Sequence, residues 1–213
     1  MLPSCQQDHK LDYQQQKLMD VFVRYIYPEK AYKVQVSFSH MDSMQQLIPQ
    51  VIDGQVLFHN HSLLKRSIGD QLIRYETNFR GDPEKEMKLI IQSASEWDLQ
   101  QTLPMVPIDQ VTISPSINRE GYFDFSAAPS NLDKDEILVL LFSDQNNQAA
   151  SISLNGPLNM TKTTVSGEAL KNLSPGPGRV YAVRKKDVAT STKHIDIRWS
   201  TEFYTDEQSI EIK

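Results

Sequence analysis

The sequence predicts an all-β protein made of two tandem antiparallel β-sandwiches, each with one short helical turn. Three observations support this fold class. Short segments of alternating apolar and polar residues recur along the chain, turn signals separate them about every 8 to 12 residues, and segments of the first half return in order in the second. The 213 residues are 39% hydrophobic and 23% charged, which is the composition of a folded protein. A single cysteine excludes a disulfide framework.

The predicted strands follow one another from the N-terminus. Residues 21–27 and 32–38 alternate apolar with polar side chains, as half-buried antiparallel strands do. Short helices are predicted at 62–68, ended by Gly69, and at 167–173, ended by a proline-glycine pair. The remaining predicted strands span residues 55–59, 71–79, 86–92, 111–114, 122–126, 136–142, 150–154, 179–184 and 194–204.

An internal repeat predicts how the strands divide into domains. Four segments of the first half match four of the second in the same order, and a strand with Tyr75 or Tyr181 follows the last match in each copy. The matched segments are 22–28 with 123–129, 34–39 with 138–143, 51–54 with 152–156, and 62–69 with 167–176. We therefore predict an N-terminal tether over 1–19, a first β-sandwich over 20–109 and a second over 110–213.

About seven short strands in each copy are typical of immunoglobulin-like β-sandwiches. In the second copy, residues 173–181 read Leu-Ser-Pro-Gly-Pro-Gly-Arg-Val-Tyr. This segment resembles the corner of fibronectin type III domains, in which a tyrosine hydroxyl bonds back to the chain, although Tyr181 comes later than in the usual spacing. The resemblance implies two tandem immunoglobulin-like domains.

The first residues resemble a bacterial lipobox. Leu2 stands three places before the only cysteine, Cys5, Ser4 stands one place before it, and a polar stretch follows. The resemblance implies lipidation of Cys5, and Gln6 in place of aspartate implies the outer membrane. Pro3 departs from the commoner residues of the motif, and the charged and apolar regions of a secretory signal would lie upstream of Met1.

Together the lipobox and the two domains resemble the small surface or periplasmic lipoproteins of Bacteroidota. The resemblance implies a place in the cell envelope, at the outer membrane or in the periplasm, with secretion as the alternative. A chain of this kind would contact the membrane through its anchor at Cys5.

Charge argues against a nucleic-acid partner. Residues 1–109 contain 11 basic and 14 acidic residues, and residues 110–213 contain 11 and 13, so neither half is basic. The one tight basic cluster, residues 184–186, precedes Asp187 at a predicted strand end. A nucleic-acid binder concentrates lysine and arginine on one face, and this pattern does not.

Few residues point to catalysis or to a metal. The sequence has no phosphate-binding glycine loop, paired-cysteine motif, zinc-protease motif or nucleophile elbow, so we expect no enzyme and no cofactor. His59 and His61, two residues apart on a predicted strand, are the weak metal candidates, with His40 as a third ligand; an exposed strand end is the alternative. Asp133, Asp135 and Glu136 resemble the start of a calcium loop, and a solvated turn is the alternative.

The two tryptophans are candidate sugar-binding residues, because flat rings stack on sugar faces. Trp199 shares one strand face with Ile195, Ile197 and Thr201, so we expect it in the core. Trp97 follows a predicted strand near the domain junction, where its ring would either be exposed as a weak ligand-binding candidate or wedge the two domains together.

The sequence therefore favours a non-enzymatic binding or structural module of the cell envelope. The expected partner is a protein or a glycan at the cell surface. One alternative is a metal-binding or enzyme-accessory domain that uses His59 and His61. A second is a pilus-like or filament subunit assembled by strand exchange.

Overall fold

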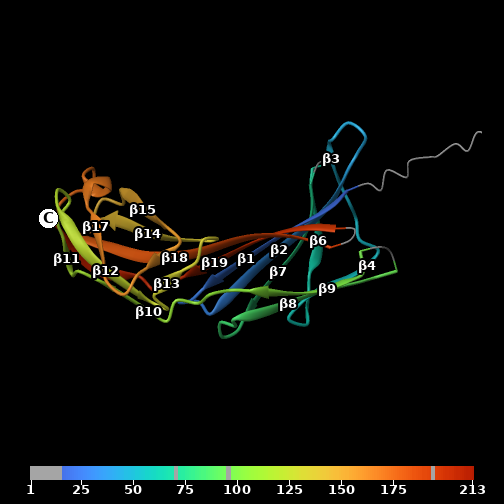
Figure 1. Ribbon diagram of the computed structural model, residues 1–213, viewed down its shortest axis with the longest axis horizontal. Helices are drawn as coiled ribbons and strands as arrows, with labels where there is room; N and C mark the ends of the chain where they lie inside the picture. The colour runs from blue at the N-terminus through green and yellow to red at the C-terminus, as the bar shows by residue number, and fades with distance from the viewer. Residues whose placement is uncertain (1–15, 70–71, 95–96, 193–194) are drawn as a thin grey trace, which may run out of the picture.

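The computed structural model describes residues 16–69, 72–94, 97–192 and 195–213 as an all-β protein, which confirms the all-β part of the predicted fold class (Figure 1). The strands, in which apolar and polar side chains alternate, form four sheets. The largest, sheet A, has 11 strands. The main path of sheet A runs β11 (Ser116–Ile117), β20 (Gln208–Ile212), β18 (Gly176–Ser191), β19 (Ile195–Tyr204), β1 (Lys17–Ile26), β2 (Ala31–Met41), β7 (Leu72–Arg80) and β6 (Leu64–Ile68). Three more strands join its side: β14 (Glu136–Asp144) on β18, β15 (Ala149–Asn155) on β14, and β3 (Leu47–Pro49) on β2.

Three smaller sheets accompany sheet A. The first has the order β5 (His61–Ser62), β4 (Gly54–Phe58), β8 (Glu86–Ser93) and β9 (Leu99–Pro104). The second has the order β10 (Gln110–Ile113), β12 (Tyr122–Ala128) and β17 (Thr163–Ser166), and the third pairs β13 (Asn131–Leu132) with β16 (Leu158–Asn159). One 3-10 turn, η1 (Glu168–Leu170), follows β17.

The long strands β18 and β19 join the two halves of the molecule. The first part of β18 pairs with β20 and β14, and its last part pairs with β19. β19 then runs parallel to β1 for ten residue pairs, from Lys17 with Ile195 to Ile26 with Tyr204. Sheet A therefore crosses the sequence boundary expected at 109/110, and the end of the chain completes the sheet of the N-terminal half (Figure 1).

The core lies between sheet A and the smaller sheets. Alternate residues of β1, β2 and β19 point inward and are buried, as the two-residue period of a strand requires. In the N-terminal half, Tyr32 of β2 meets Phe58 of β4, with ring centroids 6.5 Å apart. In the other half, Phe123 of β12 meets Phe142 of β14 at 5.9 Å. These contacts belong to one continuous hydrophobic cluster.

One of the two predicted helices is wrong. Residues 62–68 end β5 and form β6, which pairs with β7 from Leu64 and Glu76 to Ile68 and Leu72. So short a helix is marginal by itself, and the hydrogen bonds of a sheet edge outweigh its local preference. The second, over 167–173, is present only as the 3-10 turn η1.

The strand pairing also contradicts the internal repeat. The repeat would make β1 equivalent to β12, and β2 equivalent to β14. β1 and β2 are paired neighbours in sheet A, whereas β12 pairs with β10 and β17 in a sheet that does not contain β14. The matched segments therefore do not occupy equivalent places in the sheets, and similar alternation in unrelated strands accounts for the match.

Among the described residues, no helix is both long enough and apolar enough to cross a bilayer.

Candidate functional site

The outward face of sheet A bears polar side chains in rows across four strands. Because β19, β1, β2 and β7 are paired in register, Arg198, Asp20, Ser37 and Arg74 lie side by side. The next row holds Ser200, Phe22, Gln35 and Glu76. These positions are exposed or half-buried, while their neighbours along each strand point into the core.

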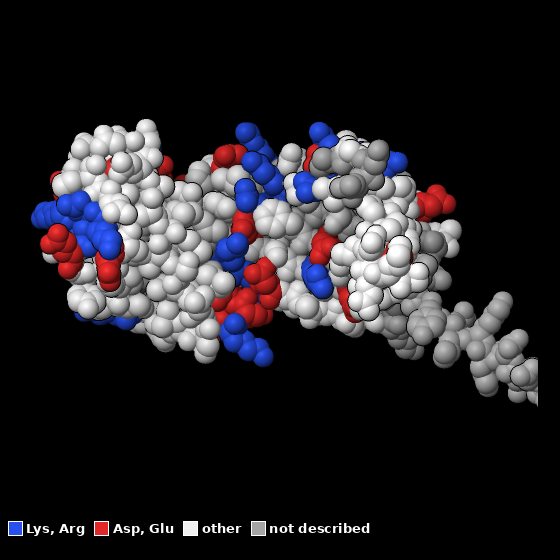
Figure 2. Space-filling model, turned by 90° about the horizontal axis from the view of Figure 1, so that it is seen from above, with Lys and Arg blue, Asp and Glu red and all other residues white. Residues whose placement is uncertain are grey.

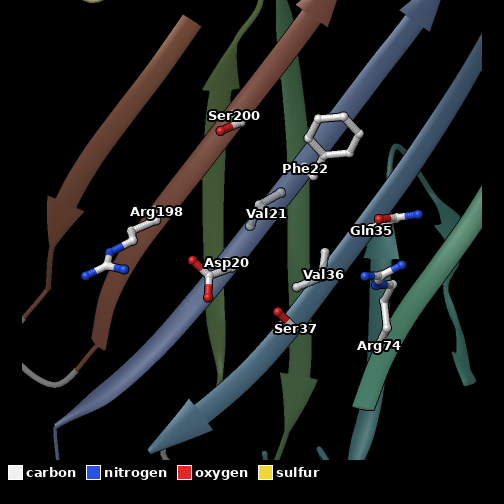
Figure 3. A pocket seen from close by; sticks show the side chains of 9 residues that line it. All are labelled: Asp20, Val21, Phe22, Gln35, Val36, Ser37, Arg74, Arg198 and Ser200. Carbon is white, nitrogen blue, oxygen red and sulfur yellow. The ribbon is translucent and has the colours of Figure 1, made fainter. Parts of the chain in front are cut away.

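A shallow depression of about 230 Å³ lies between these rows. Figure 3 shows the Phe22 ring standing beside Ser200 on one side and Gln35 on the other, with Asp20 between the strand positions of Arg198 and Ser37. Arg74 closes the side formed by β7. The depression thus combines one aromatic ring with hydroxyl, amide, carboxylate and guanidinium groups.

The charges of the depression are mixed. Loss of hydration raises the pKa of Asp20, and the nearby guanidinium of Arg198 lowers it by less. Arg74 brings a second cation to the opposite side. Figure 2 likewise shows acidic and basic side chains interspersed across the middle of the molecule, with no large patch of one sign in that view. Such a surface favours hydrogen bonding over attraction of a polyanion.

A network around Glu202 fixes one border of the depression. Arg24 holds the Glu202 carboxylate through Nε at 3.0 Å and Nη2 at 2.9 Å, and Lys185 and the Tyr204 hydroxyl each reach it at 3.0 Å. Arg24 also lies over the rings of Phe22 and Tyr204, at 5.3 and 5.0 Å. Burial alone would raise the pKa of Glu202, but Lys185, Tyr204 and Arg24 outweigh it and lower the pKa. The network thus orients Arg24, and its guanidinium makes a cation–π contact with the Phe22 ring.

A second charged cluster lies on the inner side of the junction between the halves. Glu136 is 1% exposed and is paired with Arg184, which is 4% exposed. Lys186 lies 3.3 Å from both Glu136 and Asp135, and the backbone amide of Asp133 donates to Glu136 at 3.0 Å. The predicted solvated turn is therefore wrong for Glu136. The alternative, a calcium loop, is disfavoured because the Glu136 carboxylate is already paired with the cationic side chains of Arg184 and Lys186.

These two networks account for the basic cluster at 184–186. Side chains alternate across β18, so Arg184 and Lys186 meet Glu136 on one face while Lys185 meets Glu202 on the other. All three cations have carboxylate partners within the protein.

Acid should weaken the fold because several carboxylates are held in their charged form. The pKa of Glu136 is lowered by the Asp133 amide, Arg184 and Lys186, which outweigh burial; amides of Ser174, Gln148 and Asn146 lower the pKa of Asp144. A lowered folded pKa adds stability above the unfolded value of about 4, and that stability is lost as pH falls through the folded pKa. We expect the urea midpoint to be nearly constant between about pH 7 and 5 and to fall steeply below about pH 4.

The control for this pH dependence is Asp144→Asn, which keeps the turn but removes one titrating carboxylate. Its midpoint should fall less between neutral and acidic pH than that of the unmodified protein. A midpoint that stays constant from about pH 6 to about pH 3 would contradict the expectation.

The structure does not bring the candidate histidines together as a metal site. His59 and Asn60 have φ angles of 46° and 65° and form the two-residue turn between β4 and β5, so His59 is not in the strand that the i, i+2 argument requires. Its Nδ1 lies 3.7 Å from Glu84, whereas the His61 ring stacks on Phe79 at 3.9 Å. Among the described residues, no three potential ligands, His40 included, gather around one point.

Burial lowers the pKa of His59, against the opposing influence of Glu84. Its Nε2 is buried and has no hydrogen-bond partner among the residues described. A neutral ring packed edge-on to Phe58, with centroids 5.0 Å apart, accounts for this environment.

Both tryptophans are in the core. Trp199 is 7% exposed on the same face as Ile195, Ile197 and Thr201, which confirms its predicted place. Trp97 is 6% exposed and packs edge-on against Phe38 of β2, 5.2 Å away, within the N-terminal half. It is therefore neither an exposed sugar platform nor a wedge between the halves. Cys5 lies outside the described residues.

Sequence reasoning missed the residues of the depression. The alternation in 21–27 and 32–38 already placed Phe22 and Gln35 on the polar face of their strands. Their register with Ser200 and Arg74 depends on pairing between distant segments, which alternation does not encode. No protein-family model matches this chain, and no curated protein matches it either.

Proposed function

We propose that the protein is a non-enzymatic glycan-binding module of the cell envelope, anchored through a lipid on Cys5. Its ligand would lie across the outward face of sheet A, in the depression around Phe22. On this proposal the two halves are immunoglobulin-like sandwiches that share sheet A, and the N-terminal tether connects them to the outer membrane.

The observation that carries the proposal is the set of groups around the Phe22 ring. A sugar presents an apolar ring face and a rim of hydroxyls, and the depression offers an aromatic face with donors and acceptors beside it. Its shallow, open shape suits an oligosaccharide that lies along the sheet better than a small substrate enclosed in an active site. Arg24, held by Glu202, contacts the ring, and this contact would orient the ring before a ligand binds.

Binding is tested with the full chain carrying Cys5→Ser, screened against an array of bacterial-surface oligosaccharides and titrated with any glycan it captures. Phe22→Ala should weaken that binding by about tenfold, which corresponds to about 1.4 kcal/mol. Arg198→Ala should weaken it as well, because a charged hydrogen-bond donor is lost.

The matched control is Tyr122→Ala, which removes an aromatic ring that is 74% exposed on β12 and does not line the depression. Its affinity should equal that of the parent chain. Capture of no oligosaccharide, or an equal loss in Phe22→Ala and Tyr122→Ala, would contradict the proposed ligand.

The anchor is tested separately by mass spectrometry of the mature protein from cells that express the gene with its upstream sequence. We expect acyl chains on Cys5 and none in Cys5→Ser. An unmodified Cys5 would contradict the proposed anchor, but it would not affect the proposal of the glycan site.

A further inference from the structure

The hairpin between β2 and β3 projects from the end of the molecule at which the described chain begins (Figure 1). Met41 at the end of β2 donates its backbone amide to the Gln16 carbonyl at 2.9 Å, and His40 pairs with Lys17. The C-terminus lies at the opposite end of the view. Any anchor that precedes Gln16 in the sequence therefore reaches the body of the protein beside this hairpin.

The hairpin exposes apolar side chains that the core does not use. Met44 is 72% exposed and Leu47 51%, and Val51, two residues after the end of β3, is 53% exposed. With Ile48 they make up four of the seven large hydrophobic residues found exposed in the described part of the chain. Single exposed apolar residues are ordinary, but four within eight positions form a patch.

The turn itself does not require an apolar tip. One oxygen of Asp42 accepts the amides of Met44 at 2.9 Å and Gln46 at 2.8 Å, and Gln45 has a φ of 61°. The hairpin between β14 and β15 repeats this geometry around Asp144, with amides at 2.8 and 2.9 Å and a φ of 61° at Asn147. There Asn146 takes the place of Met44. The same turn is thus built with a polar tip at one place and an apolar tip at the other.

We propose that the β2–β3 hairpin inserts its apolar tip into the lipid surface that holds the Cys5 anchor. This inference rests on the proposed anchor. Cys5 precedes Gln16 by 11 residues, a span of at most about 40 Å when fully extended, so the anchored bilayer lies within reach of the tip. Asp42 is the only charged residue from Met41 to Val51, and its carboxylate already accepts two amides. The tip would add a second membrane contact and orient the molecule, with sheet A leading away from the bilayer.

The test couples the only cysteine to a maleimide lipid in vesicles of phosphatidylethanolamine and phosphatidylglycerol. This reproduces an anchor at Cys5 whether or not cells attach one, so failure of the cellular anchor and failure of the hairpin proposal are distinguishable. Met44→Trp reports on the tip, and Asn146→Trp reports on the matched turn at β14–β15. Trp97 and Trp199 are buried and supply a common background.

Brominated lipids should quench the added emission of Met44→Trp by about twofold or more and shift it to the blue, while Asn146→Trp stays unquenched. In the chain with native tips, Leu47→Gln combined with Ile48→Gln should increase access of a protease to the coupled protein. Quenching of neither tryptophan, or equal quenching of both, would overturn the proposal. An equal blue shift of Met44→Trp in the soluble chain at the same concentration without vesicles would also overturn it, because the tip would then be covered by another copy of the chain and not by lipid.

Discussion

Glu136→Ala is expected to lower the free energy of unfolding by about 3–5 kcal/mol. The Glu136 side chain is fully buried, and the Arg184 side chain, only 4% exposed, would keep its charge with no carboxylate opposite it. The remaining partners of Arg184 are the carbonyls of Pro129 and Asn131, which do not neutralise a charge. Urea unfolding measured at neutral pH gives the loss directly.

Two variants separate the buried pair from an ordinary ion pair. Lys162→Ala breaks a contact to Asp124 in which both side chains are more than half exposed, and it should cost less than about 1 kcal/mol. Glu136→Leu combined with Arg184→Met replaces the pair by apolar groups and should recover most of the loss. An equal effect of Glu136→Ala and Lys162→Ala would contradict the role given to the buried pair.

Tyr25→Ala is expected to cost about 3–5 kcal/mol. Tyr25 has no exposed surface, stacks on Phe203 at 5.3 Å and meets Tyr32 edge-on at 4.7 Å. Its neighbour Phe203 belongs to β19, so the substitution opens a cavity where the end of the chain joins its beginning. Thermal and urea unfolding of the variant and the parent provide the measurement.

Tyr25→Phe is the matched variant, because it removes only the hydroxyl that donates to the Gly81 carbonyl at 3.1 Å. It should cost about 1 kcal/mol. Tyr27→Ala, at a ring that is 43% exposed, should cost less than Tyr25→Ala. A loss for Tyr25→Phe as large as that for Tyr25→Ala would mean that the hydrogen bond, not the packing, is the main contribution.

The sequence located most strands because local alternation records which side chains face the core. It underestimated β18, which was predicted over 179–184 and extends over Gly176–Ser191. The charges at Lys185 and Lys186 interrupt the alternation, and these lysines fit in a paired strand because Glu202 and Glu136, both distant in sequence, neutralise them. Only the folded arrangement brings those carboxylates to the strand.

The predictions for the candidate site residues were right where neighbouring residues determine the structure and wrong where it depends on distant segments. Trp199 was placed correctly because its strand face can be read from its neighbours in the sequence. The proposed histidine pair assumed that His59 continues a strand, whereas the positive φ angles at His59 and Asn60 make the turn there. The depression around Phe22 could not be predicted, because it depends on the register of four paired strands. One of these strands lies within the last 20 residues of the chain.

The parallel pairing of β1 with β19 has a consequence for how the protein is made. Arg24 and Glu202, which meet in that pairing, are 178 residues apart. During synthesis from the N-terminus, the first half of the chain emerges long before the strand that completes its sheet. Sheet A is therefore completed only when translation is nearly finished, since β19 has to reach β1 before their contacts can stabilise the sheet. On the proposed envelope location, this delay would keep the chain unfolded while a channel for unfolded chains can still accept it.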